Sequence, residues 1–282
     1  MVQRRSLLDF IPHLILAIGI LILAFPVYVA FVASTWDAAT ISNGQMPLRP
    51  GPHFLENYTR TILVGTSKST RAPVGGMMLN SLIMAVVIAV GKIAISLISA
   101  FAVVYFRFPF RMAAFWTIFV TLMLPVEVRI YPTYKIVADL QLLDTFAGLT
   151  IPLIASATAT LLFRQFFMTV PDELVEASRI DGAGPMQFFK DTLLPLSITS
   201  IAAMFVIQFI YGWNQYLWPL LITTRDDMQT IVIGIRKMIV TQDALTEWQI
   251  AMATAILAML PPVLVVIVMQ KLFVKGLVET EK

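Results

Sequence analysis

The sequence predicts an all-α membrane protein with six transmembrane helices. Of its 282 residues, 58% are hydrophobic and 13% are charged, and the mean hydropathy is +0.82. Soluble domains carry about 25% charged residues. A bilayer core is about 30 Å thick, so a spanning helix needs about 20 mostly apolar residues. The candidate stretches, of which the third is the shortest, are His13–Ala33, Leu82–Tyr105, Ala113–Pro125, Ala147–Phe167, Ile198–Leu221 and Ile250–Met269.

The remaining segments complete the expected layout. No small-residue cleavage site follows the first apolar stretch, so we expect that helix to be retained. Three prolines and a glycine within residues 47–52 predict irregular structure in the exported loop 34–78. The segments 126–145 and 222–248 are expected to be exported loops as well. The layout is then a cytoplasmic N-terminus (1–12), a first helix with a long periplasmic loop (13–76), a five-helix core (77–270) and a cytoplasmic tail (271–282).

Basic residues indicate the orientation of these helices. Arg107 and Arg111 lie in the short connection 106–112, which contains no acidic residue, and two further arginines precede the first apolar stretch. Short cytoplasmic loops are enriched in Lys and Arg. We therefore place both termini and the segment 168–197 in the cytoplasm. Anchoring at the ends of the spans also explains the basic pI, so the charge calls for no nucleic-acid partner.

The segment 171–195, PDELVEASRIDGAGPMQFFKDTLLP, is rich in charge although apolar stretches flank it. Pro171 followed by two acidic residues favours the start of a helix, because proline suits the first turn and acids favour its positive end. Gly182 is the residue type that ends helices in a left-handed conformation. A second short helix is expected to begin after Gly184-Pro185 and to lead into the fifth span.

The first of these two short helices has two interpretations. It could be a solvated interfacial helix that only joins two spans. Alternatively, Leu174, Ala177 and Ser178 form one face of small and medium apolar side chains that suits docking into a partner's groove. A plain connection needs only a few residues, whereas this one uses about thirty. The extra length favours the docking interpretation.

The same segment carries a known pattern. Glu-Ala-Ser at 176–178, a glycine after three residues, and Thr-Leu-Leu-Pro after nine more resemble the EAA motif of permease subunits of binding-protein-dependent ATP-binding-cassette (ABC) importers. Ser178 stands where the pattern has a second alanine, and Thr192 where it has isoleucine. WNQYLWPLLIT resembles the end of the fifth helix in sugar-type permeases of this family. LMLPVEVRIYPTY, SATATLLFRQFFMT and DELVEASRIDGA together are similar to the branch that imports sn-glycerol 3-phosphate.

The resemblance implies a fold, partners and a mechanism. The fold is that of a type I ABC importer permease, in which this chain and a second permease subunit form the pathway in the lipid bilayer. Two copies of a cytoplasmic ATPase grip the coupling loop 168–197, and a periplasmic solute-binding protein delivers the substrate. ATP and Mg²⁺ would be bound by the ATPase, and this chain would hold no cofactor. The implied ATPase-coupling residues are Glu176, Ala177, Ser178, Gly182, Leu194 and Pro195.

Two cations are candidates for contact with substrate. Ionisable residues at membrane depth are costly and mark functional sites. Lys92, near the middle of the second span, could contact an anionic group such as a phosphate, pair with a carboxylate of a partner chain, or extend its ammonium to the membrane surface. Arg129, after the third span, could pair with Glu127 at the rim or form part of an exported gate, where its guanidinium offers a bidentate fork.

The fifth span carries a polar stripe. Gln208, Tyr211 and Gln215 fall on one helical face, and Asn214 lies beside it. This stripe could line a passage for a hydroxylated solute. It could equally form hydrogen bonds with a neighbouring permease. Both interpretations place the stripe inside the protein rather than against lipid.

Other functions find less support in the sequence. No Ser/His/Asp set or His-rich motif indicates an enzyme, and the two isolated histidines do not predict a metal site. The only Gly-Lys pair, Gly91-Lys92, lacks the glycine and the Ser/Thr of a phosphate-binding loop. An ion-coupled secondary transporter is the alternative, but no internal repeat is visible. Within the importer class, a neutral sugar, another polyol or a glycerophosphodiester are the alternative substrates.

Overall fold

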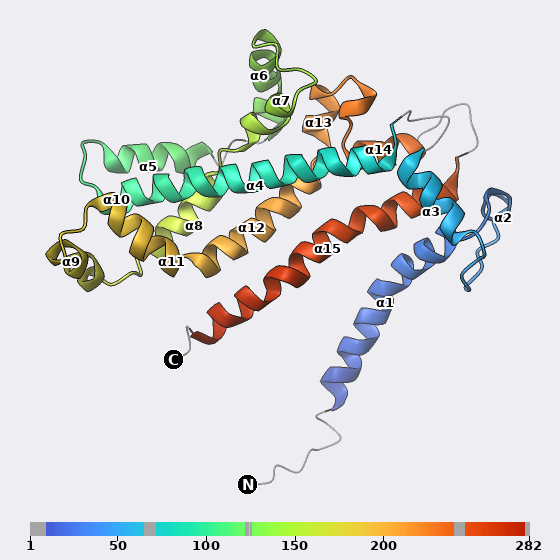
Figure 1. Cartoon of the computed structure of the whole chain (residues 1–282), viewed down its shortest axis with the longest axis horizontal. Coiled ribbons are helices and arrows are strands. Elements are labelled where there is room, and N and C mark those ends of the chain that lie inside the picture. The colour runs from blue at the N-terminus through green and yellow to red at the C-terminus, as the bar shows by residue number, and fades with distance from the viewer. Residues whose placement is uncertain (1–9, 65–71, 122–123, 125, 240–245, 280–282) are drawn as a thin grey trace, which may run out of the picture. The chain divides into compact units, whose positions relative to one another are not determined.

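The computed structural model describes residues 10–64, 72–121, 124, 126–239 and 246–279. These residues form helices and their connections and contain no strand (Figure 1). The chain divides into two compact units, each described by itself below. Unit 1 comprises Met1–Gly76 with Gly234–Leu260, and unit 2 comprises Met77–Ile233 with Pro261–Lys282. The helices α4 (Val74–Tyr105), α14 (Ile231–Ile239) and α15 (Trp248–Glu279) contribute to both units.

Unit 1 is more regular than the sequence suggested. Besides α1 (Phe10–Ser34), it contains α2 (Ala38–Ser42) and α3 (Phe54–Leu63) within the segment that was expected to be irregular. Asp37 caps α2 by accepting the amides of Ala39 and Thr40. On α3, Asn57 Nδ2 donates to the backbone oxygens of Ser34 and Trp36 at 2.9 and 2.8 Å. The expectation of irregular structure was wrong because these two hydrogen bonds join residues far apart in sequence, which a local pattern of prolines and glycines does not reveal.

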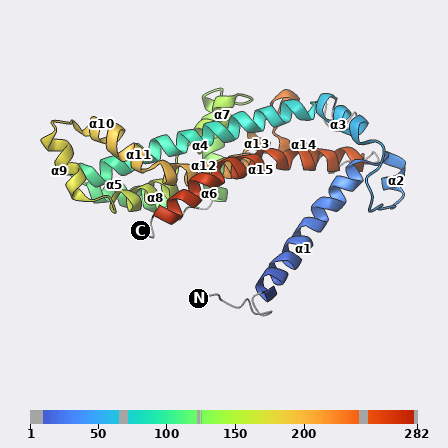
Figure 2. The same cartoon turned by 60° about the horizontal axis from the view of Figure 1, so that its bottom comes forward.

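Unit 2 holds most of the remaining helices. After α4 come α5 (Arg111–Val120), α6 (Val126–Asp139), α7 (Phe146–Thr150), α8 (Ala157–Phe167), α9 (Asp172–Ile180), α10 (Pro185–Phe188), α11 (Leu194–Leu196), α12 (Ile198–Trp213) and α13 (Leu217–Ile222). Helix α6 occupies most of the predicted exported loop 126–145. In both views, α9 and α10 lie beside the C-terminal end of α4 (Figure 1 and Figure 2).

Three helices are long and apolar enough to cross a membrane by themselves, namely Phe10–Ser34, Val74–Tyr105 and Trp248–Leu272. Two further pairs pass the same test together but are bent, Phe146–Leu153 with Ala157–Phe167 by 47° and Pro185–Leu196 with Ile198–Trp213 by 73°. The third predicted stretch contains α5, and part of it lies outside the described residues. By length and composition, the described residues therefore contain three candidate spans, or up to five if each bent pair is one span, and the predicted six stays a prediction.

The predicted fifth helix is not continuous. α12 ends at Trp213, Asn214 caps it with its amide donating to Ile210 O at 3.1 Å, and α13 begins at Leu217. The sequence prediction of a single helix over Ile198–Leu221 is wrong in this respect. The residues on both sides of the break are apolar, so the mean hydropathy over a span-length window stays high and does not reveal the break.

A π-helical turn, Phe189–Leu193, follows α10 and precedes the motif proline. Pro195 has no amide hydrogen, and its ring clashes with the carbonyl four residues earlier, which disfavours a regular α-helix here. Ser197, at the 73° bend, donates to Leu193 O from its hydroxyl at 2.6 Å and from its amide at 3.1 Å. The proline thus accounts for the change of direction between the charged segment and α12.

A buried cluster of apolar side chains fixes the charged segment to the helices that cross the membrane. Its members come from α4, α8, α10, the π-helical turn and α12, and Phe163, Phe167 and Leu193 are 0 to 1% exposed. Val175 of α9 and Leu194 pack against this cluster at its edge. The segment that bears the motif is therefore attached firmly on one side and free on the other.

Asp144 anchors a loop of unit 2. Its carboxylate accepts hydrogen bonds from the Thr224 amide, the Thr224 hydroxyl and the Arg225 amide. Partial burial acts to raise the pKa of Asp144, but these hydrogen bonds outweigh burial and hold the pKa below its ordinary value. The interaction joins the segment after α6 to the segment after α13, which are 80 residues apart.

We expect Asp144→Asn to lower the thermal stability of the protein at neutral pH. The pKa of Asp144 is lower in the folded than in the unfolded state. The stabilisation is therefore complete above the unfolded-state pKa of about 3.9, and it is lost as the pH falls through the lower pKa of the folded state. The stability difference between wild type and variant should therefore shrink in acid. Asparagine tolerates the positive φ of 55° at this position, so the charge alone is tested. The control is Asp139→Asn, at an exposed acid of α6, and equal losses in both variants would contradict the prediction.

Candidate functional site

The helix that carries the motif begins and ends as its residues predict. Pro171 precedes α9, Asp172 and Glu173 lie in its first turn, and Arg179 lies in its last. Gly182 adopts a φ of +79°. Its amide donates to Arg179 O at 3.1 Å, and the Ala183 amide donates to Ser178 O at 2.9 Å. This pair of bonds is a Schellman motif, which requires a left-handed residue and so explains the glycine.

The two faces of α9 differ in exposure. Val175 and Ser178 are half-buried and face the rest of unit 2, whereas Glu176 and Ala177 are exposed. The sequence grouped Ser178 with the docking face, and the structure instead turns it inward. Ile180 is 85% exposed, which composition alone did not single out. An acidic side chain beside exposed apolar ones therefore forms the outer surface of α9.

The end of the motif connects this helix to the bend before α12. Leu194 packs at the edge of the buried cluster, and Pro195 is exposed. The π-helical turn and the bend at Ser197 follow from the same stretch of sequence. A force applied to α9 can therefore reach α12 through packed side chains rather than through a flexible connection.

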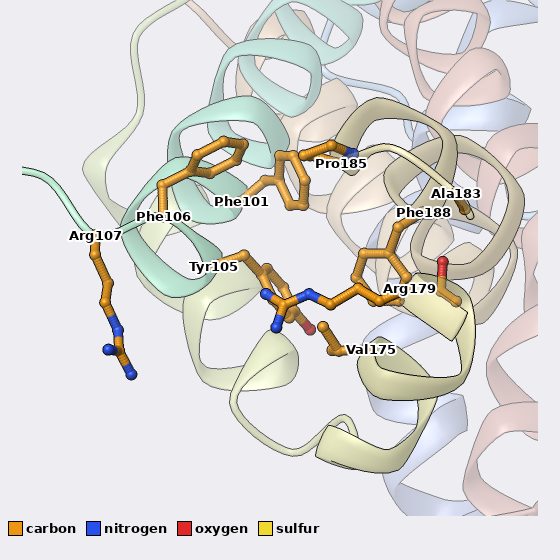
Figure 3. A pocket seen from close by; sticks show the side chains of 10 residues that line it. Phe101, Tyr105, Phe106, Arg107, Val175, Arg179, Ala183, Pro185 and Phe188 are labelled. Atoms are coloured by element: carbon orange, nitrogen blue, oxygen red, sulfur yellow. The ribbon is translucent and has the colours of Figure 1, made fainter. Parts of the chain in front are cut away.

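A pocket of about 510 Å³ lies between the C-terminal end of α4 and the inner side of α9 and α10. Figure 3 shows the Arg179 side chain extending across it toward Tyr105, with Phe188 on one side and Phe101 and Phe106 on the other. Arg107 lies at the margin. Local sequence patterns do not reveal this pocket, because its lining residues come from two distant stretches, 101–107 and 175–188.

A second polar site lies between α4 and α12. Lys92 Nζ donates to Gln208 Oε1 at 3.1 Å and stands 3.6 Å from the centre of the Tyr211 ring. Lys92 and Gln208 are 6% and 4% exposed, and Tyr211 is 38% exposed. The ammonium is therefore held by a hydrogen bond and by a cation–π contact within this chain. Lys92 thus has partners within this chain, which none of the interpretations drawn from the sequence named.

Close approach of the two helices makes this contact possible. A Cβ added at Gly212 would lie 2.9 Å from Ala85 Cα, which is closer than real Cβ atoms come. Gly212 is one turn beyond Gln208 on α12. The glycine thus lets α12 approach the α4 backbone closely. This approach brings Gln208 within hydrogen-bonding distance of Lys92.

The other predicted pathway residues lie around this pair. Arg129 is exposed on α6, within electrostatic range of Lys92. Gln215 Nε2 donates to Tyr211 O at 3.2 Å, and Asn214 is exposed at the end of α12. The structure therefore joins Lys92, Gln208 and Tyr211 directly. Asn214 and Gln215 lie at the C-terminal end of α12, and Arg129 lies on α6. Among the described residues, no group of three or more His, Asp or Glu side chains could hold a metal ion.

Comparison with known proteins identifies the family. Residues 92–279 match the model of the family described as "Binding-protein-dependent transport system inner membrane component". The chain belongs to this family. The match covers the membrane helices from the middle of α4 onward and includes the motif of α9. Together with the apolar helices, this membership makes the chain a multi-pass protein of the inner membrane.

Individual relatives resemble the chain over its whole length. The sn-glycerol-3-phosphate transport system permease protein UgpE of Rhizobium meliloti is 58% identical over 282 residues, 100% of both chains. The protein of the same name from Yersinia pestis is 57% identical with the same coverage. Among solved structures, a chain of a bacterial ABC transporter involved in the import of the acidic polysaccharide alginate has a TM-score of 0.80 at 21% identity. It covers 96% of this chain and 98% of its own, and it supports the fold.

Proposed function

We propose that the chain is the permease subunit of an ATP-driven importer of sn-glycerol 3-phosphate and forms half of its translocation pathway. The observation that carries the proposal is identity of 57 to 58% over the full length to permeases named for this substrate. The candidate cations, Lys92 and Arg129, are compatible with a phosphate.

The outer face of α9 is the proposed contact with the motor. Glu176, Ala177 and Ile180 are exposed on a helix whose other side is packed against unit 2. A rigidly attached helix with a mixed acidic and apolar surface suits docking into a groove of a partner protein. ATP and Mg²⁺ are bound by two cytoplasmic ATPase subunits, and their closure moves α9 and, through the bend at Ser197, α12. The chain itself performs no catalysis.

The site between α4 and α12 is the proposed pathway contact. Lys92 and Arg129 give this region a positive potential, which favours a phosphate over a neutral sugar. Tyr211, Asn214 and Gln215 offer groups that can hydrogen-bond the glycerol hydroxyls. Lys92 is held by Gln208, so its charge acts at a fixed place rather than on a mobile side chain. A second permease subunit supplies the other half of the pathway.

The proposed arrangement has both termini and the segment 168–197 in the cytoplasm. The loops that contain α2, α3 and α6 then face the periplasm, where a solute-binding protein delivers the substrate. The five helices from residue 77 to 270 form the core, with the first helix added before them. Arg107 and Arg111 beside the coupling segment support this orientation.

Uptake by the reconstituted transporter tests the proposal. Proteoliposomes that contain both permeases and the ATPase, with the binding protein outside, should accumulate labelled sn-glycerol 3-phosphate only when ATP is enclosed. Unlabelled substrate should compete, glycerophosphodiesters should compete in part, and maltose or glycerol should not. Competition by a neutral sugar alone would assign a different substrate. Uptake driven by an ion gradient without ATP would contradict the whole mechanism.

A further inference from the structure

The pocket behind α9 has no part in the proposed coupling or in the proposed pathway. Its walls come from the end of α4 and from the inner sides of α9 and α10, whereas the surface proposed for the ATPase is the outer side of α9. Tyr105 is the last residue of a 32-residue apolar helix. The pocket therefore opens where a spanning helix leaves the hydrocarbon and the headgroup layer begins.

The lining of the pocket combines aromatic surface with positive charge. Phe101, Tyr105, Phe106 and Phe188 form the walls, and the Arg179 side chain extends across the pocket toward Tyr105 (Figure 3). Among the described residues that line the pocket there are two arginines and no carboxylate. Asp172 is within electrostatic range of Tyr105 but does not belong to the lining. The pocket is thus suited to an anion attached to an apolar group.

The loop beside the pocket is unusually aromatic and basic. It reads FRFPFR over residues 106–111, and Phe106, Phe108 and Phe110 are 41, 40 and 85% exposed. Phe110 adopts a left-handed backbone with a φ of +61°. Aromatic rings and arginines at the end of a spanning helix are typical of the headgroup level of a bilayer. The loop places the mouth of the pocket at that level.

We propose that this pocket binds the phosphate headgroup of an anionic phospholipid of the cytoplasmic leaflet. Arg179 and Arg107 hold the phosphate, and the glycerol and first acyl carbons lie against the aromatic walls. The volume of about 510 Å³ is within the range of sites for small organic groups. The leaflet is negatively charged and supplies this ligand beside the pocket. The bound lipid ties α9 to the end of α4, an effect on coupling that rests on the proposed function.

A lipid fits the pocket better than a side chain of the motor. The exposed apolar residues that a docking protein would cover, Leu174, Ala177 and Ile180, point to the other side of α9. The apolar surface next to the pocket instead continues along the loop into α5, where Met112 and Trp116 are 43 and 54% exposed. A ligand with one charged end and a long apolar part matches a basic pocket that adjoins an extended apolar surface.

The experiment measures lipid retention by the complete transporter. The purified assembly is placed in nanodiscs of phosphatidylcholine with a minority of phosphatidylglycerol, returned to detergent, and analysed by native mass spectrometry for bound phosphatidylglycerol. The variants are Arg179→Gln, Arg107→Gln and their combination, with Lys190→Gln as the matched control, because Lys190 is an exposed cation of the same segment outside the pocket. Glu176→Lys, on the outer face, is measured alongside.

Each pocket arginine that is removed should lower retention of phosphatidylglycerol roughly fivefold, in line with the attraction of one basic residue to an anionic membrane surface. Lys190→Gln should change nothing, and Arg179→Lys should keep most of the retention. Unchanged retention in the double variant would overturn the proposal, as would loss of the ATPase subunit in place of lipid, or displacement of the lipid by inorganic phosphate. Glu176→Lys should lose coupled uptake and keep lipid retention. If Glu176→Lys instead transports normally while only the arginine variants lose phosphatidylglycerol, the coupling surface is rejected and the lipid site is supported.

Discussion

Gly182→Val in the assembled transporter should reduce ATP-driven uptake about tenfold while the chain still inserts in the membrane. Gly182 has a φ of +79°, and an L residue pays about 1–2 kcal/mol in this region, more when it is β-branched. A cost of 1.4 kcal/mol corresponds to a tenfold change in population. The Schellman motif that sets the angle between α9 and α10 should therefore open in most molecules, and the outer face of α9 would no longer meet its partner in one orientation.

A neighbouring glycine provides the control. Gly184 has a φ of −72°, which valine adopts readily, and a Cβ at either glycine meets no atom within 4 Å. The two substitutions add the same atoms to the same loop, so they differ in backbone strain rather than in steric contact. Gly184→Val should transport almost normally, and Gly182→Asn should be intermediate because asparagine tolerates the left-handed region. Uptake and ATP hydrolysis are measured in the same proteoliposomes. Equal uptake by the two valine variants would contradict the assigned role of the turn.

The charged segment could be predicted from sequence because its determinants are local. Pro171, Gly182 and Pro185 act on the backbone within one or two residues of themselves, and the structure starts and ends α9 and α10 beside them. The assignment of faces was less successful. Ser178 lies on the inner side, because the direction of α9 depends on what it packs against, and the cluster around Phe163 comes from α4, α8 and α12.

The helices that cross the membrane were predicted in position but not in continuity. Hydropathy located α1, α4 and α15, where apolar residues and helix coincide. It joined α12 to α13 because apolar residues flank Asn214 and Gln215, and an average over a span-length window stays high across two polar residues. Hydropathy also does not show which side chains pack inside the protein: Trp213 and Trp218 are 2 and 5% exposed.

The polar residues of the predicted spans were predicted in spacing but not in their contacts. Sequence spacing correctly put Gln208 and Tyr211 on one side of a helix. It left the partner of Lys92 open, since a contact over 116 residues depends on how α4 meets α12. Gly212 permits that meeting, and nothing in its local sequence distinguishes it from a glycine that merely weakens a helix. Long-range pairing, rather than residue type, is what the sequence did not specify.

Lys92→Met and Gln208→Leu should each destabilise the protein by about 1–3 kcal/mol, because each leaves a buried polar partner without its hydrogen bond. Gln208→Leu should cost more, since the group left behind is a charged ammonium that keeps only its contact with Tyr211. The double variant replaces both groups with apolar side chains, and such replacement is often close to neutral. Thermal unfolding of the purified transporter in detergent measures the three differences and yields the coupling between the two residues.

Uptake by the same variants separates two roles of Lys92. If its charge attracts the phosphate of the proposed substrate, the double variant should fold normally and still transport about tenfold less, as expected for the loss of a charge-assisted contact of 1.5–3 kcal/mol. If Lys92 serves only to join α4 and α12, restoring stability should restore uptake. Stable protein with wild-type uptake in the double variant would remove Lys92 from the pathway and leave Arg129 as its cation. Reduced uptake in a stable double variant assigns a role in transport to the polar pair itself, because its part in joining α4 and α12 has by then been replaced.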